Sequence, residues 1–189
     1  MEGVPRLLEG ITTSAQRIEK IVSNLKHMAR PDAGDLDHEV DLCEILPIAM
    51  SLLQSQIKKY SAHCHLLLPE SLPQVRGNGQ QLEQVFINLI LNALQALSHR
   101  DAEVRVRTSL EPEGEFVKVV IEDEGQGMTE EIRQRVTEPF FTTRVASGGT
   151  GLGLSICIRI IQHHSGRMEI ASQPGIGTQV SVWLPVAKV

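Results

Sequence analysis

A glycine-rich stretch at residues 148–154, with the sequence Gly-Gly-Thr-Gly-Leu-Gly-Leu, stands directly before a strongly apolar run at residues 155–164. Each glycine costs backbone entropy and offers no side chain for packing, so this density indicates a tight turn that points several backbone N–H groups at one place. The apolar run predicts a buried helix, which puts the turn at a helix N-terminus. Such a turn is a typical anion site, most often for phosphate. By itself it is a weak signal, and the rest of the chain must supply the other parts of a nucleotide site.

Charge and hydropathy exclude some classes of protein. The net charge is −5 over 189 residues, without a long basic run, so the electrostatic footprint of a nucleic-acid-binding protein is missing. The sequence contains no apolar stretch near the roughly 20 residues of a membrane span, and it does not open with a signal peptide. Its three cysteines are widely scattered, which is typical of reduced thiols. We therefore expect a cytoplasmic location.

Residues 4–30 carry a heptad pattern, which predicts a long amphipathic helix. The apolar stripe is broader than a two-stranded seam requires and suits a four-helix bundle. An intermolecular bundle is favoured over packing on the chain's own domain, because a helix at a chain end has little to pack on. Pro31 ends the helix, so we expect a first segment at residues 1–31, a linker at 32–36 and a second domain at 37–189.

The second domain opens with a predicted strand at residues 36–41 and a helix from Asp41 to about Tyr60, with Pro47 near its start. A further strand is expected at residues 63–68. Two histidines, His63 and His65, share one of its faces. Solvent-facing side chains are favoured there over metal ligands, because the sequence offers no further ligands nearby.

The next predicted helix begins at the Asn78 cap, with Gln81 three residues on, and runs to about residue 97. Asn88 and Asn92 stand one turn apart on one face of its apolar run. Burying two amides without partners is costly, so we expect them to face a polar site. A paired amide ladder inside the core is the alternative.

Two strands at residues 104–110 and 116–122 form a predicted hairpin. The second strand runs into Asp123, which places a carboxylate at the rim of a cleft, followed by Gly125 and Gly127. A segment with two aromatic residues and Thr142-Thr143-Arg144 then precedes the glycine-rich stretch and suggests a hinged segment over a pocket. Strands at 167–173 and 178–184 complete an antiparallel meander.

These motifs stand in an order that resembles the boxes of sensor histidine kinases, most closely the nitrogen-regulation type, over about residues 36–186. Residues 4–31 are similar to the second helix of the dimerisation and phosphotransfer hairpin. The resemblance implies an α+β fold, a two-layer α/β sandwich of the Bergerat (GHKL ATPase) type with a mixed sheet, preceded by one long helix. The matching motifs are residues 84–93 (asparagine box), 123–128 (first glycine box), 138–144 (phenylalanine box), 149–154 (second glycine box) and 175–178 (last glycine box).

The resemblance also implies a site for ATP and Mg²⁺. Asp123 would accept a hydrogen bond from the adenine amine, Asn92 would bind the metal, and Arg144 would add charge at the γ-phosphate. Asn88, Asn92 and Arg144 form the implied catalytic set. The implied nucleotide-binding set is Asn88, Asn92, Asp123, Gly125, Gly127, Met128, Phe140, Thr143, Gly149, Thr150, Gly151, Leu152, Gly153, Leu154 and Thr178.

One position separates a kinase from the related ATPases, which place a glutamate one turn before the metal-binding asparagine. Asn88 stands there, and an amide is no general base at neutral pH. Glu83 lies roughly 140° round the helix. Further departures from the family pattern are Asn78, where an aspartate is common, Gln95, where a basic residue often stands, Thr137 in place of an aromatic residue, and Ser165 in a His-Gly-Gly turn that begins at His164.

We therefore expect a protein-histidine kinase fragment that binds Mg–ATP and donates the γ-phosphoryl group to a histidine of a dimerisation domain. The acceptor is expected upstream of residue 1, because His27 and the other six histidines lack its sequence context. Expected partners are the upstream acceptor helix, a response-regulator receiver domain and a second copy in the intact protein, and any membrane anchor would lie upstream. The alternatives are a GHKL-type conformational ATPase and a nucleotide-binding regulatory module without transfer activity, such as an anti-sigma-type regulator.

Overall fold

Five strands form one sheet in the spatial order β2-β4-β5-β7-β6. The computed structural model describes residues 36, 38–144 and 149–187. Strand β2 is parallel to β4 and the other neighbours are antiparallel, so the predicted mixed sheet is confirmed. The strands are β2 (His63–Leu67), β4 (Glu103–Leu110), β5 (Phe116–Asp123), β6 (Arg167–Gln173) and β7 (Gly177–Pro185).

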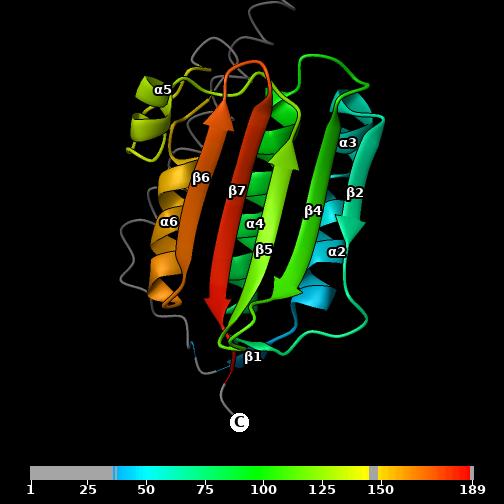
Figure 1. The fold of residues 1–189 in the computed structure, drawn as a ribbon, viewed down its shortest axis with the longest axis vertical. Helices are drawn as coiled ribbons and strands as arrows, with labels where there is room; N and C mark the ends of the chain where they lie inside the picture. The colour runs from blue at the N-terminus through cyan, green and yellow to red at the C-terminus, as the bar shows by residue number, and fades with distance from the viewer. Residues whose placement is uncertain (1–35, 37, 145–148, 188–189) are drawn as a thin grey trace, which may run out of the picture.

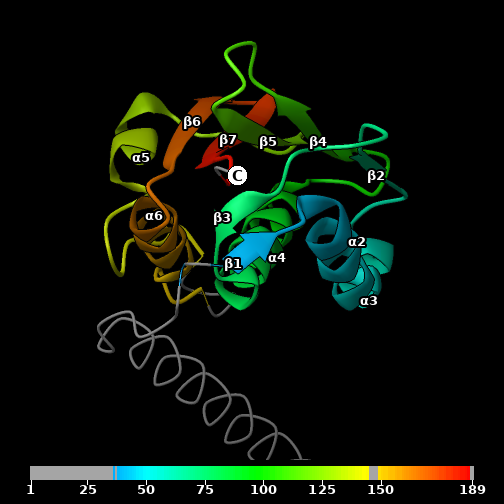
Figure 2. The same cartoon turned by 90° about the horizontal axis from the view of Figure 1, so that it is seen from below.

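Helices form a second layer on one face of this sheet (Figure 1; Figure 2). Figure 2 shows α4 in the middle of that layer, with α6 on the β6 side and α2 and α3 on the β2 side. The predicted two-layer α+β sandwich is therefore confirmed, while the predicted helix of residues 1–31 lies outside the described residues. The remaining elements are β1 (His38–Val40), α2 (Leu42–Leu52), α3 (Gln54–Tyr60), β3 (Val75–Gly77), α4 (Gly79–Ala96), α5 (Glu130–Arg135) and α6 (Gly153–His163), and β1 pairs with β3.

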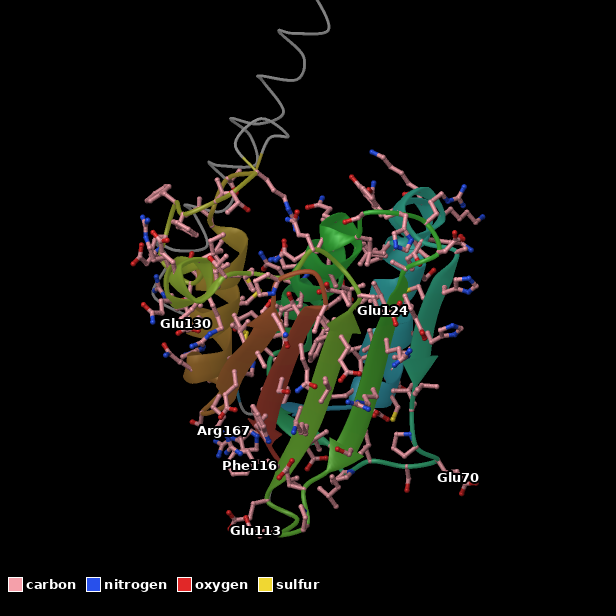
Figure 3. All side chains as sticks on the ribbon, turned by 45° about the horizontal axis from the view of Figure 1, so that its top comes forward. Glu70, Glu113, Phe116, Glu124, Glu130 and Arg167 are labelled. Atoms are coloured by element: carbon pink, nitrogen blue, oxygen red, sulfur yellow. The ribbon has the colours of Figure 1, made fainter. Side chains whose placement is uncertain are left out.

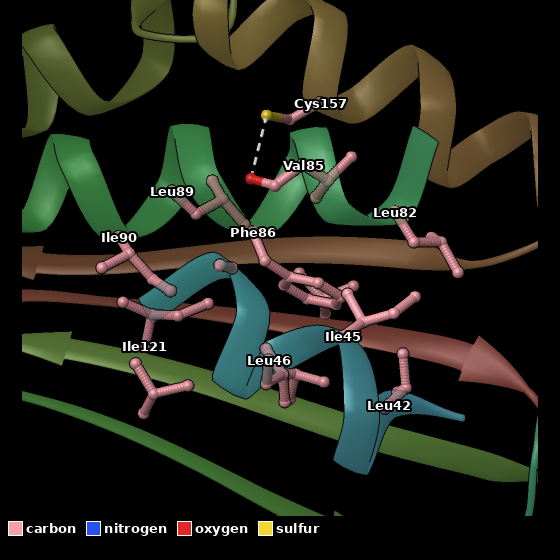
Figure 4. Close-up of a cluster of buried hydrophobic side chains, with 14 of the residues drawn as sticks. Leu42, Ile45, Leu46, Leu82, Val85, Phe86, Leu89, Ile90, Ile121 and Cys157 are labelled. Carbon is pink, nitrogen blue, oxygen red and sulfur yellow. Dashed lines mark hydrogen bonds between the residues drawn. The ribbon is translucent and has the colours of Figure 1, made fainter. Parts of the chain in front are cut away.

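Helix α4 is the centre of the core (Figure 4). Its cap is the predicted one, because the Asn78 side chain accepts the Gln81 N–H at 3.0 Å. The face toward the sheet is apolar, and Phe86 on it is fully buried beside residues of α2 and β5. Full burial of one such side chain contributes about 1.5–3 kcal/mol. The buried residues of α4 are Leu82, Val85, Phe86, Leu89, Ile90, Ala93 and Leu94.

A buried histidine ties the end of α6 to the start of α4. The Asn78 N–H donates to His164 Nε2 at 2.9 Å, and His164 Nδ1 lies 2.7 Å from the Ile160 carbonyl. The ring fills the space beside Gly77, where an added Cβ would lie 2.2 Å from it. Ser165 follows with a φ of 55°, in the left-handed region that the glycine of the family turn adopts without strain.

The face of the sheet away from the helices carries charged side chains. Arg107 contacts Glu122 at 2.6 Å across two strands. Trp183 is only 6% exposed on this face, because Lys118 and Arg167 lie 4.7 and 4.4 Å from the centre of its ring. Figure 3 shows Arg167 at the end of the sheet where the β4–β5 hairpin turns. The apolar stems of long charged side chains thus cover this face.

Two details of the first helical region were predicted wrongly. The helix expected to run from Asp41 to Tyr60 is interrupted at Leu53, which turns into the core at 5% exposure and separates α2 from α3. Pro47 lies inside α2 and not in its first turn. The solvent-facing prediction for the histidines of β2 is confirmed, since both are exposed. Among the described residues, no three His, Cys, Asp or Glu side chains form a group suited to a metal ion.

Candidate functional site

A cavity of about 480 Å³ lies between α4, the inner face of the sheet, α5 and the start of α6. It is lined by every residue of the predicted catalytic and nucleotide-binding sets except Gly125, Phe140 and Leu152. Segments 88–96, 121–128, 132–144, 149–154 and 170–180 all contribute to this lining. The structure therefore brings together residues that are far apart in the sequence.

One wall of the cavity is the C-terminal half of α4. Asn88, Asn92 and Gln95 line it, and the buried apolar side chains of the same helix face the sheet. Asn88 also makes a hydrogen bond to the buried Cys157 thiol of α6, which opposes the effect of burial that raises the pKa of Cys157 to about 12. The predicted polar position of the two asparagines is confirmed, because both line the cavity.

The floor of the cavity consists of side chains that lie opposite one another on neighbouring strands. Ile121, Val180 and Ile170 are direct neighbours on β5, β7 and β6, and all three line the cavity. Two residues further along each strand lies a polar row in which Asp123 pairs with Thr178, and Thr178 with Ser172. Because alternate strand residues share a face, these side chains also point toward the helical layer. The polar row is therefore the rim of an apolar floor.

Asp123 is the titratable group of this rim. Burial raises its pKa from an ordinary 3.8 to about 6, while the N–H groups of Gly125 and Thr178 and the positive charge of Arg144 act in the opposite direction. The Gly125 N–H lies 2.9 Å from Asp123 Oδ1. A carboxylate held this way presents an acceptor to the cavity.

Gly125 is needed for close packing and does not line the cavity. A Cβ added to it would lie 2.6 Å from both the Ala96 carbonyl oxygen and Asp123 Oδ1. The glycine thus lets the loop after β5 approach the end of α4. In this structure its N–H supports the Asp123 carboxylate.

The opposite wall comes from the described residues between α5 and α6, here called the α5–α6 segment (residues 136–144 and 149–152). Arg144 extends from it to α4, where Nη1 donates to Gln95 Oε1 at 2.7 Å and Nη2 donates to the Asn92 carbonyl at 3.2 Å. Burial lowers the pKa of Arg144, and the negative charge of Asp123 opposes that effect. The segment therefore delivers a cation to the last turns of α4, close enough to Asp123 for the two charges to interact.

Glycine-rich residues complete this wall at the start of α6. Gly149, Thr150, Gly151, Gly153 and Leu154 line the cavity. Apart from its chain neighbours and the backbone of its own helix, a Cβ added to Gly153 would meet no atom within 4 Å, so packing does not require this glycine. The space beside it is part of the cavity. Leu152 is fully buried and anchors the segment in the core.

Phe140 lies outside the lining. It is 62% exposed and has a φ of 67°, and its N–H donates to the Gly151 carbonyl at 2.9 Å. Its neighbour Phe141 lines the cavity instead. Adjacent aromatic residues in an irregular segment gave no sequence signal for which of the two turns inward.

Other lining residues were missed in the sequence. The floor residues could have been found, because Ile121 stands two residues before Asp123 on the same strand and so shares its face. Tyr60 gave no such signal, since it reaches the cavity only through tertiary packing. The missed residues are Tyr60, Leu89, Leu91, Ala93, Gln95, Ala96, Ile121, Gln126, Ile132, Val136, Phe141, Thr142, Ile170 and Val180.

Residues 77–188 match the family of histidine kinase-, DNA gyrase B- and HSP90-like ATPases, and the chain belongs to this family. It is 39% identical over 178 residues to a putative sensor protein of Shewanella frigidimarina, covering 94% of this chain and 27% of that protein. It is 29% identical to the sensor histidine kinase ZraS of Escherichia coli K12, covering 96% of this chain and 38% of ZraS. Sporulation kinase E of Bacillus subtilis is 34% identical, over 93% of this chain and 23% of that kinase. The chain thus spans about a quarter to two fifths of these relatives.

Solved structures of histidine kinases are also similar to this chain. The catalytic domain of histidine kinase ThkA has a TM-score of 0.69 at 26% identity, covering 80% of this chain and 98% of that domain. ThkA in complex with the response regulator TrrA has a TM-score of 0.78 at 25% identity, covering 98% and 52%. The predicted histidine kinase catalytic domain is confirmed, while the nitrogen-regulation type, the division into three segments and the site roles stay predictions. In the part of the chain that the structure describes, no helix is both long and apolar enough to cross a bilayer.

Proposed function

We propose that this chain binds Mg–ATP and donates the γ-phosphoryl group to a histidine of a sensor-kinase dimerisation domain. The observation that carries the proposal is one cavity shared by two α4 amides, the Asp123 carboxylate and the glycine-rich start of α6. The carboxylate suits adenine, the amide oxygens suit a hard cation, and the glycine-rich turn suits phosphates. ATP is also the nucleotide that the family's description implies.

The cavity fits such a ligand in size and chemistry. An apolar floor of Ile121, Val180 and Ile170 suits a flat purine, and Asp123 at its rim suits the adenine exocyclic amine. At the other end, the open space at Gly153 leaves room for phosphates beside backbone N–H groups.

Asn92 is the proposed ligand of Mg²⁺, with Asn88 one turn earlier on the same wall. Mg²⁺ takes few protein ligands and prefers oxygen, so a single amide oxygen beside substrate phosphates is a suitable site. When bound, the metal neutralises negative charge on the phosphates. Arg144 would add a second positive charge at the same end.

Transfer to histidine is favoured over hydrolysis. Glu83 does not line the cavity, and α4 presents it only with amides and apolar side chains, so water would lack a positioned base. In the transfer, the bond between the γ-phosphorus and its bridging oxygen breaks, a bond to an imidazole nitrogen forms, and ADP leaves. Neutral imidazole already carries the lone pair that this step requires.

The proposed partners follow from the same reaction. They are the upstream helix that carries the acceptor histidine, a second copy of the chain in the intact protein, and a response-regulator receiver domain. The complex of ThkA with TrrA supports the last of these.

Incubation with γ-labelled ATP tests the proposal. The chain alone should stay unlabelled, and a separately made dimerisation fragment with its acceptor histidine should gain acid-labile label when this chain and Mg²⁺ are added. Asn92→Ala should abolish the Mg²⁺ dependence of nucleotide affinity without unfolding the chain. Steady phosphate release by the chain alone would instead identify a conformational ATPase, and label on His27 would overturn the upstream acceptor.

A further inference from the structure

Cys157 lies where α6 packs against α4, and it is fully buried. Its Sγ lies 3.8 Å from the Val85 carbonyl oxygen of α4 (Figure 4). Asn88, three residues further along α4, makes a second hydrogen bond to the same sulfur. Residues three apart in a helix lie on the same side, so one thiol of α6 contacts two neighbouring groups of α4.

The direction of each hydrogen bond follows from the state of the thiol. Burial raises the pKa of Cys157 to about 12, so the sulfur keeps its one proton at neutral pH. That proton is donated to the Val85 carbonyl, which can only accept. The sulfur therefore has only lone pairs left for Asn88. The hydrogen bond from Asn88 lowers the pKa of Cys157, which agrees, because only a donor stabilises the thiolate.

An amide that donates to the sulfur has a fixed orientation. The Asn88 side chain carries its NH₂ group and its oxygen at two ends of one planar group, so an NH₂ group held by α6 directs the oxygen away from α6. Asn88 also lines the cavity, one turn before Asn92. The two ends of an amide are nearly equal in shape, so packing alone would not select between them.

We propose that Cys157 is a positioning residue that holds the Asn88 amide with its oxygen toward the nucleotide cavity. A hard cation and its bound waters need oxygen acceptors, and an inverted amide would offer them N–H groups instead. Cys157 itself does not line the cavity and acts only through Asn88. The inference rests on the proposed function for the identity of the ligand, whereas the orientation of the amide is a property of the nucleotide-free chain.

Side-chain amide exchange in the nucleotide-free chain tests the orientation. The NH₂ signal of Asn88 in a nitrogen-15 spectrum is assigned by its absence in Asn88→Ala. The proton donated to the sulfur should exchange with water more slowly in the unmodified chain than in Cys157→Ala, where the acceptor is gone. Equal exchange rates in the two proteins would overturn the inference.

Affinity for the Mg²⁺ complex of a non-hydrolysable ATP analogue tests the consequence. Cys157→Ala should weaken this binding about three- to tenfold, as for the loss of one neutral hydrogen bond, and the affinity measured with chelator should change less. Cys157→Ser keeps an acceptor at the same place and should bind nearly as well as the unmodified chain. In the Asn88→Ala background, Cys157→Ala should have no further effect.

A packing role for Cys157 predicts the reverse order, because serine places a hydroxyl in an apolar core and alanine does not. A loss of affinity in Cys157→Ser equal to that in Cys157→Ala would therefore overturn the inference. Ile161→Val is the matched control, since it removes one buried methyl group from the same helix outside the cavity lining. It should leave the affinity and its Mg²⁺ dependence unchanged.

Failure of the proposed function gives a different result. The unmodified chain would then bind no Mg–nucleotide, while exchange of the Asn88 amide would still depend on Cys157. Thermal melts identify any variant that fails to fold. If Cys157→Ala is such a variant, Cys157→Thr and Cys157→Val share one shape, differ in the hydroxyl, and give the same comparison.

Discussion

The two sides of the cavity are built by different means. The floor and the α4 wall consist of strands in fixed register and a helix whose other face is fully buried. The α5–α6 wall consists of turns, an exposed Phe140 with positive φ, and a guanidinium held by two hydrogen bonds. Side chains on the first side are positioned by the core, whereas those on the second are positioned by a few local contacts. We therefore expect substitutions on the two sides to separate stability from nucleotide affinity.

Two phenylalanines give the largest expected contrast. Phe86→Ala, at 0% exposure between α4, α2 and the sheet, should destabilise the fold by about 3–5 kcal/mol through loss of apolar contacts and the cavity left behind. Phe140→Ala, at 62% exposure, should change stability by less than about 0.5 kcal/mol. Urea unfolding of both variants measures the difference, and equal losses would show that the α5–α6 wall is as much a part of the core as the floor.

Asp123→Asn should have the next largest effect, this time on binding. The substitution turns an acceptor into a donor that faces the adenine amine, so nucleotide affinity should fall by about 2–4 kcal/mol, as for a mismatch at a buried charged acceptor. Titration with a non-hydrolysable ATP analogue measures the loss, and Asp101→Asn, at an exposed position, is the control. Binding within threefold of the unmodified chain would contradict the adenine assignment.

The raised pKa of Asp123, about 6, predicts opposite pH effects on folding and on binding. A carboxyl whose pKa is raised by folding stabilises the fold most at low pH, and that contribution is lost as pH rises through 6. Binding requires the ionised form, so between pH 7 and pH 5 the affinity should fall about tenfold, because about a tenth of the groups are ionised one unit below the pKa.

Asp123→Asn provides the baseline for this pH profile. Nucleotide phosphates also titrate in this range, and the variant retains their contribution while lacking the carboxyl. If its affinity shows the same fall between pH 7 and pH 5, the titrating group is not Asp123.

Gly153→Ala gives the smallest expected effect on nucleotide binding. Apart from its chain neighbours and its own helix backbone, the added methyl group meets no atom within 4 Å, and alanine favours a helix over glycine, so the fold should gain at most about 1 kcal/mol. The same methyl group enters the space proposed for phosphates and should weaken ATP binding several-fold without lowering the melting temperature. Unchanged affinity would place the phosphates elsewhere.

The floor side was largely predictable from the sequence. Alternating apolar residues identified the strands, the Asn78 cap and the apolar period identified α4, and the position of Asp123 at a strand end placed it on the rim. These signals are local, and tertiary structure agrees with them. The break between α2 and α3 at Leu53 was not predictable, because it depends on tertiary packing that turns this one leucine into the core.

The α5–α6 side was predictable only in outline. The glycines predicted a tight backbone turn, but nothing in the sequence indicated that Phe141 faces the cavity in preference to Phe140. The contact of Arg144 with Gln95 joins residues 49 positions apart through side chains alone. Such contacts follow from the folded arrangement and leave no periodic pattern.

Trp183 gives the molecule an optical property that follows from the two faces of the sheet. It is the only tryptophan in the chain, and it lies on the face opposite the cavity. Its emission should therefore report loss of the sheet during unfolding and remain nearly constant when nucleotide binds. The two cations above the ring should also attract anions, so iodide should quench this emission more efficiently than a neutral quencher of the same size.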